Sequence, residues 1–300
     1  MVYLDNHIIT INSTDGTLLN VTFKSNINFA FKGLLKDDVN IVRTYVTVLN
    51  AQIPVSFYVI DDTTNTLLIY DPINGLKTVT IPIGNYNSGT LTTALNSAFV
   101  TAGIPLTVAI NPVNGILTFT STDPIERIRI NANRFGSTLA TILGMDIFSI
   151  FINPLSSTPL PYPLNLLGKS KLLINSRNLN NVAYTSFGLG FTTTIATVPV
   201  NVPPYSLIQY ACAVEQQKNV LVNRVLDNID IQILDTDNNF INFNNVNWSI
   251  TLVLSIERMD ANKFHIQSFK DYLGNDQPIQ PEEIELNPPA KDDVLEFLQG

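Results

Sequence analysis

The sequence predicts an all-β protein, an antiparallel β-sandwich with a smaller α+β insertion. Apolar and polar residues alternate with a period of two along several segments, the pattern of a strand with one buried face. Clusters of Asn, Asp, Thr, Gly and Pro separate these segments at short intervals, as turns do in a sandwich. Before residue 260, helical spacing of apolar residues occurs only within residues 70–145, which confines the helices to one insertion.

A long β run leads into the predicted insertion. It covers residues 45–54, continues through residues 56–60 and turns at residues 61–65, where Asp, Thr and Asn gather. Its polar positions are Thr, Asn and Ser rather than His, Cys, Glu or Lys. Side chains of the first kind hydrogen-bond to neighbours and water but rarely transfer protons. The segment therefore favours a scaffold over an enzyme.

Two helices are predicted inside the insertion. Ser88 is a candidate cap for the first helix, which Gly103 ends. Ser137 is a candidate cap for a second, shorter helix that stops at Gly144. The inward apolar residues are Leu91, Ala94, Leu95, Ala98 and Phe99 in the first helix and Leu139, Ile142 and Leu143 in the second. Each helix thus has one face that can pack on a sheet.

The rest of the insertion and the chain after it are predicted to form strands, turns and loops. A β-hairpin is expected around residues 112–115, and the Pro-rich residues 154–163 are expected to form the loop that returns from the insertion. Residues 172–257 are nearly all strand and turn, with a turn at residues 235–239. Half-buried strands are indicated where Ile229, Ile231 and Ile233 alternate with Asp230 and Gln232, and where Ile250, Leu252, Leu254 and Ile256 alternate with polar residues. Trp248 is expected to be a core or sheet-surface anchor.

The charge pattern excludes a broad nucleic-acid footprint. Charged residues make up 14% of the chain, well below the roughly 25% of an ordinary soluble domain. Seven acidic residues and one lysine follow residue 275, so −6 of the net charge of −8 lies in the tail and −2 in the body. Phosphate contacts need clustered Lys and Arg, which this body lacks. Low charge with abundant Asn and Thr is typical of a surface covered by partners, although a secreted protein would share it.

No membrane span, signal peptide or cofactor is expected. The N-terminal residues lack a basic stretch followed by an apolar one, and the apolar stretch at residues 142–155 is interrupted by polar residues and proline. Cys212 lies in an apolar run and is expected to be a buried small residue. His7 and His265 lie near the two ends of the chain, so neither suits a nucleophilic triad or a zinc site.

Three short motifs resemble ligand sites and fail on spacing. Residues 167–170 match the end of a phosphate-binding loop, but Pro163 stands where its first glycine belongs. Residues 188–190 lack the third glycine of a dinucleotide loop. Residues 235–239 carry calcium-loop spacing, but Phe240 replaces the required glycine. No metal site, cofactor or enzymatic activity is predicted, although a carboxylate pair for glycoside hydrolysis stays open.

Residues 261–300 are predicted to form an acidic, Pro-rich C-terminal arm. Pro-rich segments at residues 277–283 and 287–289 are extended and poorly suited to a core. Residues 292–298 can form one or two helical turns, and the arm can dock on a neighbouring subunit or remain a solvated terminus. The candidate docking residues are Val294, Leu295, Phe297 and Leu298. Residues 298–300 also match the start of a cleavage pattern favoured by adenovirus-type maturation proteases.

Several segments, in this order, resemble the penton (minor capsid) proteins of virophages, Polinton-like viruses and some large DNA viruses. The likeness extends over roughly residues 18–258. The segments that carry it are Val48–Ile60, Ile81–Tyr86 with the helix that follows, Val108–Thr120, Asp227–Asp235 and Asn247–Leu252.

The resemblance implies a jelly-roll protein that forms homopentamers at the fivefold vertices of an icosahedral capsid. Residues 1–62 and 165–260 would form the jelly roll, and residues 63–164 would form the insertion. The partners would be other copies of the chain and neighbouring major capsid proteins, with no nucleic acid and an unknown host receptor. The protein would be made in the host cell without a signal peptide and reside in the virion. An alternative is a β-rich attachment or glycan-binding head, which would be a trimer.

Overall fold

The predicted fold class is confirmed: the protein is mostly β, with two antiparallel sheets that form a jelly roll and a smaller α+β insertion. The structure is a computed structural model. It describes residues 2–19, 23–72, 75–132, 137–146, 148–179, 183–184, 191–212, 218–221 and 225–259.

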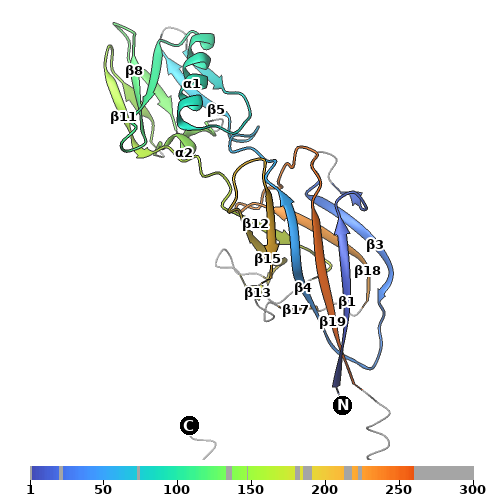
Figure 1. Cartoon of the computed structure of the whole chain (residues 1–300). Coiled ribbons are helices and arrows are strands. Elements are labelled where there is room, and N and C mark those ends of the chain that lie inside the picture. Colours follow the sequence, from blue (N-terminus) through green and yellow to red (C-terminus); the bar gives the residue numbers. More distant parts are fainter. Residues whose placement is uncertain are drawn as a thin grey trace, which may run out of the picture. The chain divides into compact units, whose positions relative to one another are not determined.

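Two sheets make up the jelly roll (Figure 1). In spatial order, the first sheet contains β1 (Val2–Asn12), β19 (Ser249–Met259), β4 (Ile41–Pro54) and β16 (Leu207–Ala211), with β17 (Asn219–Val220) also paired to β4. The second sheet contains β15 (Thr194–Pro199), β12 (Lys171–Asn175), β18 (Leu226–Leu234), β3 (Asn26–Leu35) and β2 (Thr17–Leu18). A separate two-stranded ribbon pairs β13 (Ala183–Tyr184) with β14 (Phe191–Thr192).

The order of the strands defines the jelly roll. The eight main strands, in chain order, are β1, β3, β4, β12, β15, β16, β18 and β19. The first of these pairs with the eighth, the second with the seventh, the third with the sixth and the fourth with the fifth. This is the pairing that results when one long hairpin is rolled into two facing sheets.

One extra residue in β4 lets two alternation patterns share the same buried face. Opposite β19, the register shifts between Thr251 and Leu252, so that Leu49 is the additional residue of β4. Val48 before this bulge and Ala51 after it are both buried, whereas Leu49 is exposed. The bulge thus explains why the apolar residues of this long strand do not follow a single period of two.

Trp248 anchors the junction between the sheets, as predicted. Its ring is 2% exposed and meets the ring of Phe29 edge to face, with centroids 6.3 Å apart. Its indole Nε1–H donates a hydrogen bond to the Lys24 carbonyl oxygen at 2.7 Å. The large apolar ring is therefore buried without leaving its polar atom unsatisfied.

The expectation that residues 229–233 are half-buried is wrong, because both faces of β18 (Leu226–Leu234) are buried over residues 229–234. Ile229, Ile231 and Ile233 face the core, but Asp230 is only 5% exposed. One carboxylate oxygen of Asp230 accepts hydrogen bonds at 2.9 Å from the Ser176 hydroxyl and from the backbone N–H groups of residues 177 and 178. A loop cap covers the outer face at this point, which period-two alternation alone does not reveal.

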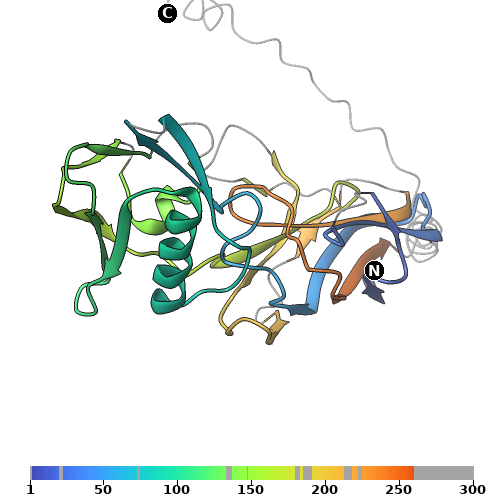
Figure 2. The same ribbon diagram turned by 90° about the horizontal axis from the view of Figure 1, so that it is seen from above.

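The insertion contains two small sheets and two helices. The first sheet contains, in spatial order, β10 (Ile150–Ile152), β9 (Ile128–Asn131), β5 (Thr66–Asp71) and β6 (Gly75–Thr80). The second contains β11 (Ser157–Pro163), β8 (Ile116–Ser121) and β7 (Leu106–Ile110). The helices are α1 (Ser88–Ala102) and α2 (Ala140–Leu143). Helix α1 lies along the strands of the insertion in both views (Figures 1 and 2) and turns Leu91, Leu95 and Phe99 inward.

Both predicted helix caps are displaced. The N-cap of α1 is Asn87 rather than Ser88: its side chain accepts a hydrogen bond from the Thr90 N–H, and Thr90 reciprocates in a capping box. The N-cap position of α2 is Leu139, without a side-chain bond. The Ser137 hydroxyl instead accepts a hydrogen bond from the backbone N–H of Leu68. Gly103 and Gly144 end the two helices in the left-handed conformation, as predicted.

The segment expected to be a returning loop contains a strand. Residues 157–163 form β11 and pair with β8, with an irregularity between Pro159 and Pro163. Proline is compatible with this position because β11 is an edge strand, where some N–H groups need no partner strand. Conversely, residues 56–60, which the sequence predicts to continue the preceding β run, do not form a strand. They contribute only an isolated β-bridge between Ile60 and Gly84.

The buried side chains form two clusters. One lies between the jelly-roll sheets and includes residues from 9–57 and 172–256. The other lies inside the insertion and includes residues from 60–160. The domain boundaries expected at residues 62 and 165 remain a prediction.

A pair of matched core substitutions tests whether the two clusters unfold separately. Leu95→Ala removes a buried side chain from the insertion, and Leu252→Ala removes one from between the jelly-roll sheets. Each should lower the free energy of unfolding of its own cluster by about 2–5 kcal/mol. Differential scanning calorimetry should show that each variant shifts a different transition. A single transition that both variants shift equally would show that the clusters unfold as one unit.

Candidate functional site

Four chain connections meet at one end of the jelly roll. They are residues 13–25, the insertion, residues 200–206 and residues 235–248. Backbone hydrogen bonds link them: the Ser13 N–H donates to the Trp248 carbonyl, and the Val55 N–H donates to the Ser206 carbonyl. The jelly-roll order requires this meeting, because paired antiparallel strands bring alternate connections to the same end.

Lys169 joins the two ends of the insertion connection to the connection between β18 and β19. Its ammonium group lies 2.9 Å from the carboxylate of Asp235, in the connection between β18 and β19. It also lies 3.8 Å from the carboxylate of Asp61, at the entrance to the insertion. Lys169 itself lies on the returning chain just before β12. From the sequence alone, residues 167–170 resemble only a failed phosphate loop, because nothing in the local sequence identifies the two distant carboxylates.

Asp235 organises the turn that was predicted at residues 235–239. Its Oδ1 accepts hydrogen bonds at 2.9 Å from the backbone N–H groups of Asp237 and Asn239. Burial raises the pKa of Asp235, but the hydrogen bonds and the charge of Lys169 outweigh burial and hold that pKa below its ordinary value. The folded protein therefore favours the ionised carboxylate. The residues with calcium-loop spacing form this turn.

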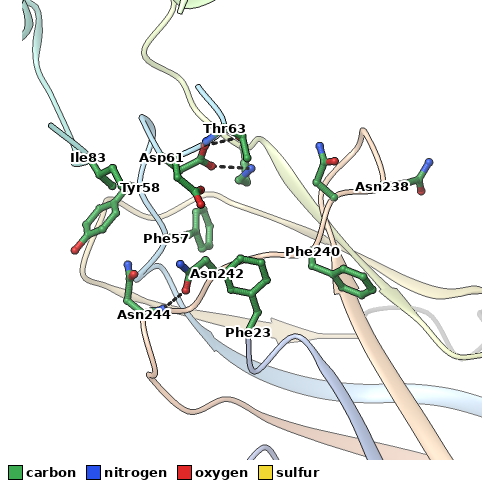
Figure 3. Close-up of a pocket in the computed structure, with 13 residues that line it drawn as sticks. Phe23, Phe57, Tyr58, Asp61, Thr63, Ile83, Asn238, Phe240, Asn242 and Asn244 are labelled. Atoms are coloured by element: carbon green, nitrogen blue, oxygen red, sulfur yellow. Dashed lines mark hydrogen bonds and ion pairs between the residues drawn. The ribbon is translucent and has the colours of Figure 1, made fainter. Parts of the chain in front are cut away.

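A pocket of about 620 Å³ lies beside this ion pair (Figure 3). Its aromatic lining comes from residue 23, residues 57–58 and residue 240, on three different connections. Phe57 is buried and packs edge to face on Phe243 at 6.3 Å. Phe23, Tyr58 and Phe240 are half-buried, so part of each ring faces the pocket. The full lining is Phe23, Phe57, Tyr58, Asp61, Asp62, Thr63, Ile83, Lys169, Asn238, Asn239, Phe240, Asn242 and Asn244.

Hydrogen bonds stiffen the polar rim of the pocket. The Asn244 N–H donates to the Asn242 side chain at 2.9 Å, and the Ser56 hydroxyl donates to the Phe243 carbonyl at 2.6 Å (Figure 3 draws the first of these). The Asp61 carboxylate accepts from the N–H and the hydroxyl of Thr63. Rim groups fixed in this way can present a preformed surface to a ligand.

The jelly roll exposes apolar side chains at both edges of its first sheet. On β1, Leu4 and Ile8 are 47% and 70% exposed, and within the described chain this strand pairs only with β19. On the opposite edge, Leu207 of β16 and Val220 of β17 are exposed, and among the residues that the structure describes both strands pair only with β4. Unpaired edge strands with exposed apolar side chains are suited to contact another chain.

The two histidines, the cysteine and the C-terminal arm do not contribute to the pocket as described. His7 is exposed, and its ring lies 3.2 Å from the Asp5 carboxylate. The expectation that Cys212 is buried is wrong: it lies just beyond the end of β16 and is partly exposed. His265, residues 188–190 and the arm with Val294, Leu295, Phe297 and Leu298 lie outside the described residues. Within the described residues, no group of three or more His, Cys, Asp or Glu side chains could hold a metal ion.

In the part of the chain that the structure describes, no helix combines the length and the apolar character that a membrane crossing requires.

Comparisons with known proteins give a structural likeness but no sequence match. No protein-family model matches the chain, and no curated protein matches it. Among solved structures, the chain is similar to the crystal structure of the mavirus penton protein, with 12% sequence identity and a TM-score of 0.47. That likeness covers 86% of this chain and 100% of the penton chain.

The ion pair of Lys169 and Asp235 predicts a pH-dependent contribution to stability. Lys169→Met leaves a mostly buried carboxylate without its cation, which should lower the free energy of unfolding at pH 7 by on the order of 1–3 kcal/mol. Because the folded pKa of Asp235 is lowered, the contribution is present above its unfolded pKa of about 3.9. It is lost as the pH falls through the folded pKa. Urea unfolding of both proteins at pH 7, 5, 4 and 3 measures the difference.

Asp235→Asn is the matched control for this prediction. Asparagine keeps a side-chain oxygen for the N–H groups of Asp237 and Asn239 but carries no charge. In this background, Lys169→Met should cost less and its effect should not change between pH 7 and pH 3. An equal effect of Lys169→Met in the wild-type background at all four pH values would contradict the assignment.

Proposed function

We propose that the protein is a structural capsid protein, a penton that forms pentamers at the fivefold vertices of an icosahedral shell. Residues 1–62 and 165–260 form the jelly roll that builds the ring, and residues 63–164 form an insertion domain. The protein is not an enzyme and resides in the virion. Its partners are other copies of itself and neighbouring major capsid proteins, without nucleic acid.

The observation that carries the proposal is the presence of two different exposed apolar edges on one jelly-roll sheet. Leu4 and Ile8 mark the β1 edge, and Leu207 and Val220 mark the β16–β17 edge. A contact between two different surfaces is heterologous, and repetition of such a contact closes a ring when the rotation fits. A contact of one edge with itself would give only a dimer. The fold therefore suits a cyclic assembly.

The sequence resemblance supports the fivefold ring in particular. It extends through both parts of the jelly roll and through the insertion, from roughly residue 18 to residue 258. The chemistry of the charged residues also suits a scaffold. Lys169 forms ion pairs with Asp235 and Asp61 in a structural contact, and Asp230 accepts hydrogen bonds from the loop at residues 176–177. These groups hold segments in place rather than being poised to transfer protons.

The C-terminal arm, residues 261–300, is proposed to dock on a neighbouring capsid subunit. Val294, Leu295, Phe297 and Leu298 would supply the apolar contact, and the acidic residues around them would remain solvated.

The mass of the full-length protein in solution tests the ring. Light scattering after size exclusion should give about 166 kDa, five times the chain mass of 33.2 kDa, and negative-stain images should show fivefold rings. Cyclic fivefold closure is uncommon, so this mass is specific. A trimer would contradict the penton and favour an attachment head. If the chain alone is a monomer, it should still form the ring when it assembles together with the major capsid protein, and it should then lie at the vertices. Absence of the ring from these co-assembled shells would reject the proposal.

A charge at either edge of the first sheet should break the ring without unfolding the subunit. Ile8→Asp and Leu207→Asp each place a carboxylate in the proposed contact, and each should weaken association at least about tenfold, or about 1.4 kcal/mol. Val113→Asp is the control, because Val113 is 93% exposed on the hairpin turn of the insertion. Sedimentation velocity measures the assembly, and circular dichroism verifies the fold. Rings that survive both edge substitutions would exclude these edges as the contact.

A further inference from the structure

We propose that the pocket at the insertion end of the jelly roll binds a neutral sugar residue of a glycan. This site is independent of ring assembly, because its lining residues lie on the connections between strands rather than on the sheet edges. The volume of about 620 Å³ is within the range of about 300–1,000 Å³ that small-molecule sites occupy.

The aromatic residues supply the apolar part of the recognition. Phe23, Tyr58 and Phe240 are half-buried and approach the pocket from three connections (Figure 3). The face of an aromatic ring carries partial negative charge, which attracts the weakly positive C–H groups on one face of a pyranose. Partly exposed rings in a concave site leave apolar area that a sugar can cover, so they favour a ligand with one apolar face.

The polar residues supply groups that match sugar hydroxyls. Within the described chain, the Tyr58 hydroxyl and the Asn238 side-chain amide take part in no hydrogen bond, and Asn242 uses only its carbonyl oxygen. These groups include both donors and acceptors, and a hydroxyl can serve either one. A ligand rich in hydroxyls can therefore satisfy them together, whereas a purely apolar ligand cannot.

The charges in the pocket select against an anionic ligand. Lys169 is the lining cation, and its charge is already balanced by Asp235 at 2.9 Å and Asp61 at 3.8 Å. Asp62 also lines the pocket and has no ion pair within the described residues. The pocket therefore carries a net negative charge and offers no free cation to a sialic acid, a sulfated sugar or a phosphate. The amides and the tyrosine hydroxyl are neutral, which favours a neutral sugar.

Binding of simple glycosides to the full-length chain tests the site. The probes are the methyl glycosides of glucose, galactose, mannose and N-acetylglucosamine, with the sialic acid methyl glycoside as the anionic comparison. Saturation-transfer-difference NMR and titration should detect at least one neutral glycoside with a dissociation constant of about 0.1–10 mM. Tyr58→Ala and Phe240→Ala should each weaken that binding about tenfold or more. Tyr58→Phe keeps the ring and should weaken it less.

Tyr162→Ala is the matched control, because Tyr162 is an exposed tyrosine on β11 that does not line the pocket. It should bind as the wild type does, and circular dichroism verifies the fold of every variant. The proposal is overturned if no neutral glycoside binds the wild type at about 20 mM, or if binding is unaffected by Tyr58→Ala and Phe240→Ala. Preferential binding of the sialic acid glycoside, or of Nα-acetyl-lysine amide as a cationic probe, would also overturn the assignment to a neutral sugar.

Discussion

The packing of two sheet faces against each other is the constraint on which the rest of the structure depends. Ile53 and Ile250 from the first sheet and Ile231 from the second are all inaccessible to water. To bury these faces, the chain sends most successive main strands to opposite sheets, so most connections run from one sheet to the other at an end of the sandwich, although β12 and β15 follow one another in the same sheet. The insertion occupies one of these connections, between β4 and β12, and adds a second core without altering the order of the first.

Where the four connections meet at one end, their backbone groups need hydrogen-bond partners and their charges need counter-charges, because the sheets do not supply them there. Asp235 and Asn242 supply partners through hydrogen bonds inside their own turns, and the Ser56 hydroxyl bonds to the distant Phe243 carbonyl. Lys169 links both ends of the insertion connection to the connection between β18 and β19 electrostatically. A pocket remains because side chains anchored to different loops cannot pack as closely as those of paired strands. The groups that stabilise this end therefore also shape the surface that it offers to a ligand.

Much of the fold could be predicted from the sequence, because period-two alternation and turn residues are local signals. Trp248, the turn at residues 235–239 and the two helix-ending glycines lie where such signals place them. The errors arise where a distant segment decides. The buried outer face at Asp230 depends on a loop about fifty residues away, and β11 is a strand only because β8 is beside it. Lys169 could not be identified as a linking residue, since its partners are 66 and 108 residues away in the chain.

The exposed apolar edge of β1 lowers the solubility of a free subunit but would favour the proposed assembly. Apolar side chains such as Ile8 gain roughly 1.5–3 kcal/mol when they are fully buried, and an unpaired edge also invites contact with any extended chain. A subunit that worked alone would be expected to protect this edge with charge or proline. In the proposed ring, each β1 edge would meet the complementary edge of the next copy, so a weak contact would be repeated around the ring and neither edge of the first sheet would remain free. The same exposure that is a liability in a monomer would thus be the feature that favours the proposed ring.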